Sequence, residues 1–209
     1  ILIRNGLRFS KDVTDLSTYF PLKDSKFVKC HSKDVAMWEI LFKDGGLVLD
    51  TDNLCIRSLI ECVPNPGTFE MAAPLGSPTL DYCTSPYYSS AVAGIAESST
   101  TLKAKSWALA IVNEKQDLPW GATGPSLVTA VAQTTDSKLF YTFPYKTAGG
   151  HSGLAHQEVY MKGAEAESRW NIVHLYRQTP EYQQYLSKLS PKTVDSEELL
   201  LHRIIKSIL

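Results

Sequence analysis

The chain has 209 residues, of which 44% are hydrophobic and 21% are charged, and its formal net charge is −1. These values are ordinary for a single globular domain that buries its own core. Because the Lys and Arg residues are scattered and the net charge is close to zero, we expect no nucleic-acid partner. No apolar run approaches the roughly 18 residues that a membrane-spanning helix needs, so we expect no membrane span in this segment.

The first predicted elements come from the N-terminal 50 residues. The stretches "ILIRN" and "FVKC" have the apolar character of short strands. Residues 32–43 predict a helix, because Ser32 suits an N-cap and Asp34 would lie in the first turn, where the helix dipole favours an anion. Gly45 marks the end of this helix. The apolar run "LVLD" then predicts a central strand of a parallel sheet.

Further strands and helices alternate along the rest of the chain. "SAVAGIAE", "KLFYTFPY" and "NIVHLY" are typical of strands, whereas residues 102–112 and 125–132 are typical of helices. Residues 146–168 predict an irregular loop. Residues 180–209 predict C-terminal helices, over 182–189 and 197–209. Alternating strands and helices favour an α/β fold with a mostly parallel sheet.

Four cysteines, Cys30, Cys55, Cys62 and Cys83, form no C-x-x-C pair and have no His at zinc-finger spacing. We therefore expect no structural zinc site. An even number of cysteines permits disulfides without requiring them, so it indicates no particular cellular compartment.

Two carboxylates follow the strand "LVLD". Asp50 and Asp52 are two residues apart, and in an extended backbone such residues point the same way, with Cα atoms about 6.5 Å apart. Ligands of open α/β sheets bind beyond the carboxyl ends of the strands. Carboxylates placed there can share one hard cation, Mn²⁺ or Mg²⁺, which would hold a diphosphate. We therefore predict a metal site at Asp50 and Asp52.

Four segments resemble one known family in the same order. "HSKDVAMWEILFKDGGLVLDTD" is similar to the D-x-D core of glycosyltransferase family 32, and "WGATGPSLVTAV" to its Gly-Pro segment before a helix. "LFYTFPY" resembles the family's aromatic-Pro stretch and "NIVHLY" its closing strand with a His. Together the four segments are far more specific than D-x-D alone.

The resemblance implies a GT-A-like fold, with a Rossmann-like mixed sheet flanked by helices. It also implies a nucleotide-sugar donor such as a UDP-hexose, a divalent metal, a glycan, glycolipid or other hydroxyl acceptor, and retention of anomeric configuration. The family's first strand and nucleotide-binding turn have no counterpart before Ile1. We therefore expect a domain that is truncated at its N-terminus and lacks its first βα units.

Matching the family segment by segment gives further candidate residues. Asp34 would contact the donor, and Met37 stands where family members usually carry Arg. Ser89 and Ser90 would also bind the donor, at a place where the family often has Asn.

On the acceptor side the resemblance implies the segment formed by Thr123, Gly124 and Pro125. Trp120, in the loop before it, is a candidate for stacking on an acceptor sugar. His174 is expected to complete the metal site, because two carboxylates leave an octahedral ion short of ligands and the family carries a His in this strand. No catalytic base is assigned.

Two other functions stay open. A non-catalytic sugar- or nucleotide-binding module derived from this family would keep the donor-binding residues without turnover. A metal-dependent nucleotidyltransferase also uses spaced carboxylates, but it would need a basic phosphate-binding loop, and none is evident. The motif "GGHSGLAH" does not match a hydrolase nucleophile elbow, because Leu154 occupies the place of the last Gly.

Overall fold

The computed structural model of the protein describes residues 2–3, 7–8, 27–50, 53–55, 67–75, 86–114, 117–143, 148–149 and 172–174, together with Ser187 and Ser190. The chain divides into two compact units. The first contains residues 1–50, 63–75 and 85–143, and the second contains residues 51–62, 76–84 and 144–209.

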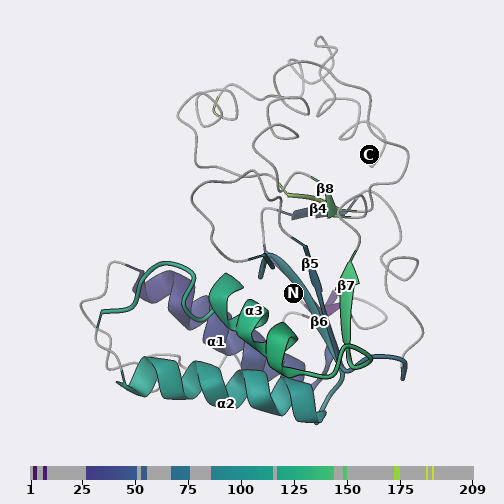
Figure 1. Cartoon of the computed structure of the whole chain (residues 1–209). Coiled ribbons are helices and arrows are strands. Elements are labelled where there is room, and N and C mark those ends of the chain that lie inside the picture. The colour runs from purple at the N-terminus through teal and green to yellow at the C-terminus, as the bar shows by residue number, and fades with distance from the viewer. Residues whose placement is uncertain are drawn as a thin grey trace. The chain divides into compact units, whose positions relative to one another are not determined.

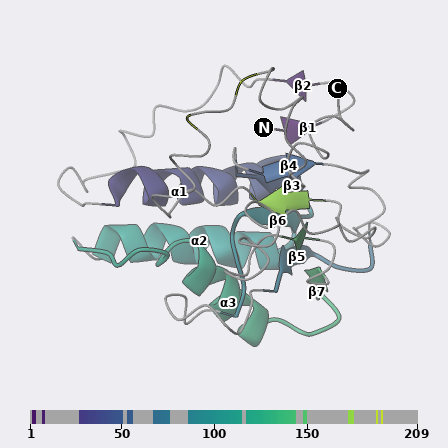
Figure 2. The same cartoon turned by 90° about the horizontal axis from the view of Figure 1, so that it is seen from above.

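The first unit is a mixed α/β structure. Its principal described elements are three helices and a four-stranded sheet: α1 (Val28–Lys43), α2 (Ser99–Glu114), α3 (Pro125–Thr134), β3 (Gly46–Leu49), β5 (Met71–Pro74), β6 (Ala91–Gly94) and β7 (Phe140–Phe143). A short antiparallel pair, β1 (Leu2–Ile3) and β2 (Leu7–Arg8), also belongs to it. The three helices lie together on one side of the sheet (Figures 1 and 2).

The four-stranded sheet has the order β3-β6-β5-β7. β6 runs antiparallel to both of its neighbours, whereas β5 and β7 are parallel. The expectation of a mostly parallel sheet with β3 at its centre is therefore wrong for the described strands. No strand was predicted at β5, which pairs antiparallel with β6. Directly after β5, an antiparallel bridge joins Leu75 to Tyr87.

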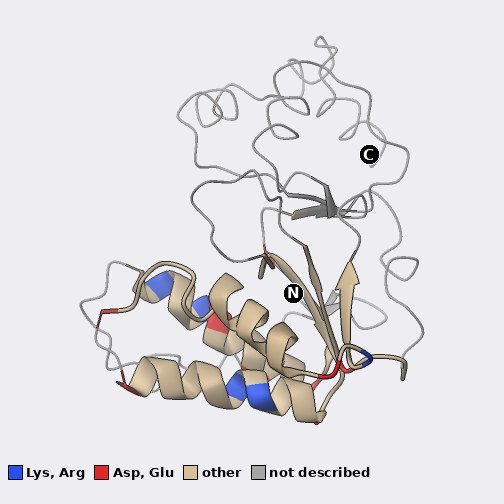
Figure 3. Ribbon diagram, in the orientation of Figure 1, with Lys and Arg blue, Asp and Glu red and all other residues tan. Residues whose placement is uncertain are grey.

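Apolar side chains fill both faces of this sheet. The face toward the helices carries Met71, Ala73 and Val92, which pack with the buried sides of the three helices. The opposite face carries a smaller cluster that includes Ala72 and Ala93. Charged residues lie on the helices and at strand ends, and the four strands themselves contain none (Figure 3). The charged groups of the sheet region are thus confined to the ends of the strands.

Helix α1 begins earlier than the sequence predicted. It starts at Val28, so "FVKC" does not form a strand, and the hydroxyl of Ser32 donates a 2.7 Å hydrogen bond to the carbonyl of Val28. Ser32 is therefore inside the helix and is not its N-cap. The first turn contains no acidic residue. The extra turn forms because His31 continues the buried side of the helix by one more turn.

The other predicted elements of this unit are confirmed. Helix α1 ends as expected, because Gly45 follows it with φ of +64° and donates to the carbonyl of Leu41. The strands β6 and β7 and the helices α2 and α3 lie where the sequence placed them. Trp38 is a fully buried core residue on the apolar side of α1.

The second unit is described through three short strands: β4 (Asn53–Cys55), β8 (Ala148–Gly149) and β9 (Ile172–His174). β9 pairs antiparallel with β4 and parallel with β8. The predicted strand "NIVHLY" is confirmed at β9. Apart from Ser187 and Ser190, the predicted C-terminal helices lie outside the described residues, as does the predicted loop 146–168 apart from β8.

Candidate functional site

Asp50 lies directly after β3, where the strand leaves the sheet. Its backbone N–H donates to the carbonyl of Ser90 at 2.8 Å, so the pairing of β3 with β6 continues one residue beyond both strands. The Asp50 side chain is 26% exposed. Two residues predicted to bind the donor, Asp50 and Ser90, are therefore neighbours at one end of the β3–β6 pair.

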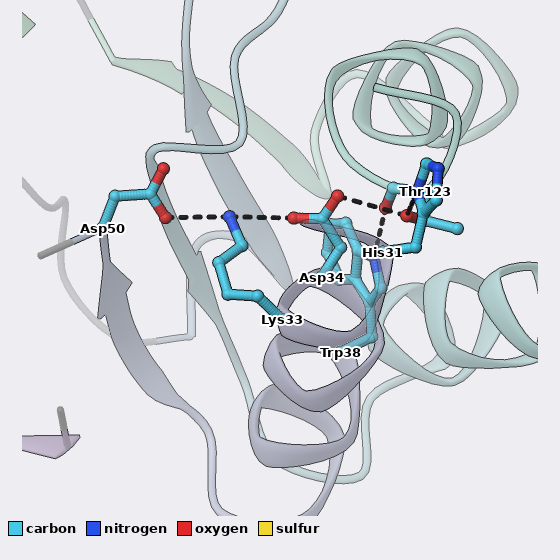
Figure 4. A network of polar contacts seen from close by, with 6 residues as sticks. All are labelled: His31, Lys33, Asp34, Trp38, Asp50 and Thr123. Atoms are coloured by element: carbon cyan, nitrogen blue, oxygen red, sulfur yellow. Dashed lines mark hydrogen bonds and ion pairs between the residues drawn. The ribbon is translucent and has the colours of Figure 1, made fainter. Parts of the chain in front are cut away.

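Lys33 connects Asp50 to a second carboxylate. Its ammonium lies 2.8 Å from Oδ1 of Asp50 and 2.8 Å from Oδ1 of Asp34 (Figure 4). Lys33 and Asp34 are consecutive on α1, whereas Asp50 comes from the end of β3. The two carboxylates therefore point at one position, and a cation of the chain occupies it.

Asp34 is held from the other side by the turn before α3. The Thr123 hydroxyl donates to Oδ2 of Asp34 at 3.1 Å. A Cβ on Gly124 would lie 2.6 Å from that same oxygen and 2.7 Å from the Ser89 hydroxyl. The segment 123–125 therefore packs directly on Asp34 and Ser89, and position 124 accommodates only glycine without a shift.

Two further residues of α1 hold Thr123 in place. Nε1 of Trp38 donates to the Thr123 carbonyl at 2.7 Å, and Nδ1 of His31 lies 2.9 Å from the Thr123 hydroxyl (Figure 4). Since the single hydroxyl hydrogen of Thr123 goes to Asp34, Nδ1 of His31 must carry the hydrogen of their contact. Nε2 of His31 is buried and has no partner among the described residues.

The electrostatics follow from burial and from these contacts. Asp34 is only 4% exposed, and burial raises the pKa of its carboxyl above the ordinary value, although Lys33 and Thr123 act in the opposite direction. Burial alone would lower the pKa of Lys33, but the charges of Asp34 and Asp50 outweigh it and raise that pKa. Lys33 is therefore a fixed positive charge at neutral pH.

Most of the predicted donor and acceptor residues come together. Six of them form one connected site: Asp34, Asp50, Ser89, Ser90, Thr123 and Gly124. Pro125 is the buried first residue of α3. Trp120 is 38% exposed in the preceding turn.

The remaining predicted metal ligands are not placed. Asp52 lies outside the described residues. His174 is described only through its backbone, which pairs with Asn53 in the second unit.

The chemistry of the site fits a hard cation in part. No group of three or more His, Cys, Asp or Glu side chains is arranged around one metal position among the described residues. Two carboxylate oxygens do point at one position, where the ammonium of Lys33 lies. Carboxylate oxygens suit Mn²⁺ and Mg²⁺. Asp50, which is partly exposed at the end of the strand, is the better placed of the two to share such an ion.

The sequence motifs did not indicate that His31, Lys33 and Trp38 belong to this network of polar contacts. A usable signal was present, because residues 31, 34 and 38 have the spacing of one side of a helix. A His and an Asp that share the buried side of a helix with a Trp need polar partners. The partner of both residues is Thr123, which lies 92 residues after His31 and 89 after Asp34, and no local pattern could identify it.

Comparisons with known proteins give no relative for this chain. No family model, no curated protein and no solved structure matches it. In the part of the chain that the structure describes, no helix has the length and apolar character needed to cross a bilayer.

Proposed function

We propose that the chain is a metal-dependent glycosyltransferase domain with a GT-A-like fold. It would move a sugar from a nucleotide-sugar, a UDP-hexose, to a hydroxyl acceptor with retention of configuration. The observation that supports this most is the meeting of separate segments around Asp34. The start of α1, the end of β3, the residues before β6 and the turn before α3 each contribute a polar group there.

Each group has a role in the proposal. Asp50 and Asp52 hold Mn²⁺ or Mg²⁺ in this proposal, and Asp52 enters from the sequence alone. The metal, when bound, offsets the charge that develops on the leaving diphosphate. Ser89 and Ser90 offer hydroxyls to the donor, and both residues are buried in the absence of a ligand.

The acceptor side is formed by the turn before α3. Thr123 and Gly124 are fixed against Asp34, so they set the position of the backbone there. Trp120 offers an exposed ring surface of the kind on which a sugar stacks.

The test is turnover by the whole chain. With Mn²⁺ and a set of UDP-sugars we expect slow release of UDP for at least one sugar, and faster release when a suitable hydroxyl acceptor is added. Asp50→Asn should abolish the release, because an amide keeps the size of the carboxylate without its charge. Asp44→Asn is the matched control, since Asp44 is an exposed acid at the C-terminal end of α1, before β3. Equal turnover in both variants would contradict the proposal.

One observation favours the alternative of a binding module. Lys33 already places a positive charge where Asp34 and Asp50 point, so one of the two carboxylate charges is compensated without an added metal. A binding module would bind a UDP-sugar without consuming it, and its binding would persist in excess chelator. Release of UDP only in the presence of Mn²⁺ would exclude it.

A further inference from the structure

Lys33 is the described cation that contacts both carboxylates of the site, and it is accessible from solvent. Its side chain is 43% exposed, against 6% for Asp34 and 26% for Asp50. The two contacts use two of the three N–H groups of its ammonium. The third N–H is therefore a charged donor that a ligand can reach.

We propose that Lys33 binds the diphosphate of the nucleotide donor directly, as a fixed cation beside the metal site. This inference deepens the proposed function and rests on it. It adds a donor-binding residue that the resemblance does not assign. The group that Lys33 recognises is the diphosphate, and not the base or the sugar.

The charge balance of the site requires a cation of this kind. A diphosphate brought to the end of β3 approaches the carboxylates of Asp34 and Asp50, and both repel it. A divalent ion held by Asp50 and Asp52 would leave Asp34 uncompensated, because Asp34 is buried behind Lys33. Lys33 compensates the charge of Asp34, so that the metal is left to attract the diphosphate, and its third N–H is a donor on the accessible side of the ion pair.

The position of the ammonium is set before any ligand arrives. Asp34 is fixed from behind by Thr123, and the backbone of Asp50 is fixed by Ser90. Lys33 is held between them at 2.8 Å from each. A lysine is flexible in isolation, so this clamp removes rotamer freedom that binding would otherwise have to remove. A preordered charge of this kind favours tight binding of phosphate oxygens.

The alternative is that Lys33 only compensates Asp34 and never touches a ligand. The two roles differ in which ligand is affected. Loss of a diphosphate ligand weakens UDP and inorganic diphosphate but leaves uridine unchanged. Loss of a purely structural ion pair either weakens all three ligands together or weakens the two anionic ligands only through the uncompensated charge of Asp34, and in that second case adding Asp34→Asn restores their binding.

The experiment is calorimetric titration of the whole chain, in the presence of Mn²⁺, with UDP, uridine and inorganic diphosphate. Lys33→Met should weaken UDP and diphosphate by about tenfold, the effect of losing one charged hydrogen bond, and should leave uridine unchanged. Lys33→Arg, which keeps the charge, should retain most of the affinity. Lys105→Met is the matched control, because the ammonium of Lys105 forms its ion pair with Glu39 of α1, at 2.8 Å.

The outcomes separate the two claims. UDP affinity of Lys33→Met within twofold of wild type, or an equal loss for UDP and uridine, would overturn the role of Lys33. If Lys33→Met does not fold, the double variant Lys33→Met with Asp34→Asn removes the uncompensated carboxylate, and its diphosphate affinity should still be reduced about tenfold. If wild type binds diphosphate through Lys33 but not UDP, the proposed function fails while the Lys33 site stands.

Discussion

Two carboxylates of the first unit, Asp34 and Glu70, accept hydrogen bonds from threonine hydroxyls, yet their surroundings shift their pKa values in opposite directions. Glu70 precedes β5 and accepts three bonds at the beginning of α2, from the Ser99 hydroxyl and from the N–H and hydroxyl of Thr100. Burial acts against it, but these bonds lower its pKa. Asp34 is buried in the core, and burial raises its pKa.

The comparison separates a structural carboxylate from a candidate functional one. The charge of Glu70 is satisfied by donors that are fixed parts of α2, so nothing else is needed to hold it. The charge of Asp34 is satisfied by one threonine and by a partly exposed lysine that it shares with Asp50. A ligand that binds this lysine or Asp50 changes the charge balance at Asp34. The described donors of Glu70 all belong to α2, so the charge balance at Glu70 does not depend on such a ligand.

The largest difference should appear when one threonine is removed from each site. Thr123→Val leaves both Oδ2 of Asp34 and Nδ1 of His31 without their described bonds in the core, at a cost of about 3 kcal/mol of unfolding free energy. Thr100→Val leaves Glu70 with two of its three bonds and should cost under about 1 kcal/mol. Urea unfolding followed by circular dichroism measures both. Equal losses would mean that burial does not distinguish the sites.

A smaller effect is expected from Glu70→Gln. Because the pKa of Glu70 is lowered on folding, its contribution is present above the ordinary value of 4.5 and is lost as the pH falls through the folded value. The variant should therefore be about 1 kcal/mol less stable at pH 7. The deficit should shrink in acid. A deficit that does not depend on pH would point to packing instead of charge.

Asp34→Asn should give the opposite pH trend. The folded pKa of Asp34 is raised, so its stabilising contribution is present below the ordinary value of 3.8 and is lost as the pH rises through the folded value. The stability of the variant relative to wild type should therefore increase with pH across that window. Unfolding curves collected at several pH values measure this difference. A relative stability that falls with rising pH would show that Lys33 outweighs burial at Asp34.

The smallest effect is expected at the ion pair between Lys105 and Glu39. Its 2.8 Å distance equals that of the pair between Lys33 and Asp34, but both of its side chains are partly exposed. Lys105→Met should change the unfolding free energy by only about 0.5 kcal/mol, and less in high salt. Lys33→Met should cost clearly more, because it leaves a buried carboxylate without its cation. Equal costs would show that the burial of Asp34 does not make its ion pair with Lys33 more important than an exposed one.

The sequence predicted those features that depend on local patterns. The end of α1 at Gly45, the apolar β6 and Pro125 at the start of α3 each have a signal within a few neighbouring residues. Strand β5 was missed, because "MAAP" is buried at every position and shows no alternation. The start of α1 was misplaced, since Ser32 has the side chain of an N-cap but bonds to Val28 inside the helix.

The candidate site divides in the same way. Asp50 was predictable as an acid at the end of an apolar strand, and Thr123 and Gly124 were indicated by the resemblance. The contact between Asp34 and Thr123 joins residues 89 positions apart, which no local pattern encodes. No local pattern distinguishes Lys33 from the other lysines of α1. Its role follows only from the approach of β3 to α1, which brings Asp50 to its ammonium.

Metal-dependent binding of a nucleoside diphosphate at Asp50 is tested most directly by titration calorimetry with UDP. We predict that wild type binds UDP with Mn²⁺ and loses binding in excess chelator. Asp50→Asn should bind UDP at least about tenfold more weakly with Mn²⁺ while its unfolding curve stays close to wild type, since Asp50 is partly exposed. Asp52→Asn should behave in the same way. Unchanged UDP affinity in Asp50→Asn, or in wild type with excess chelator, would contradict the account.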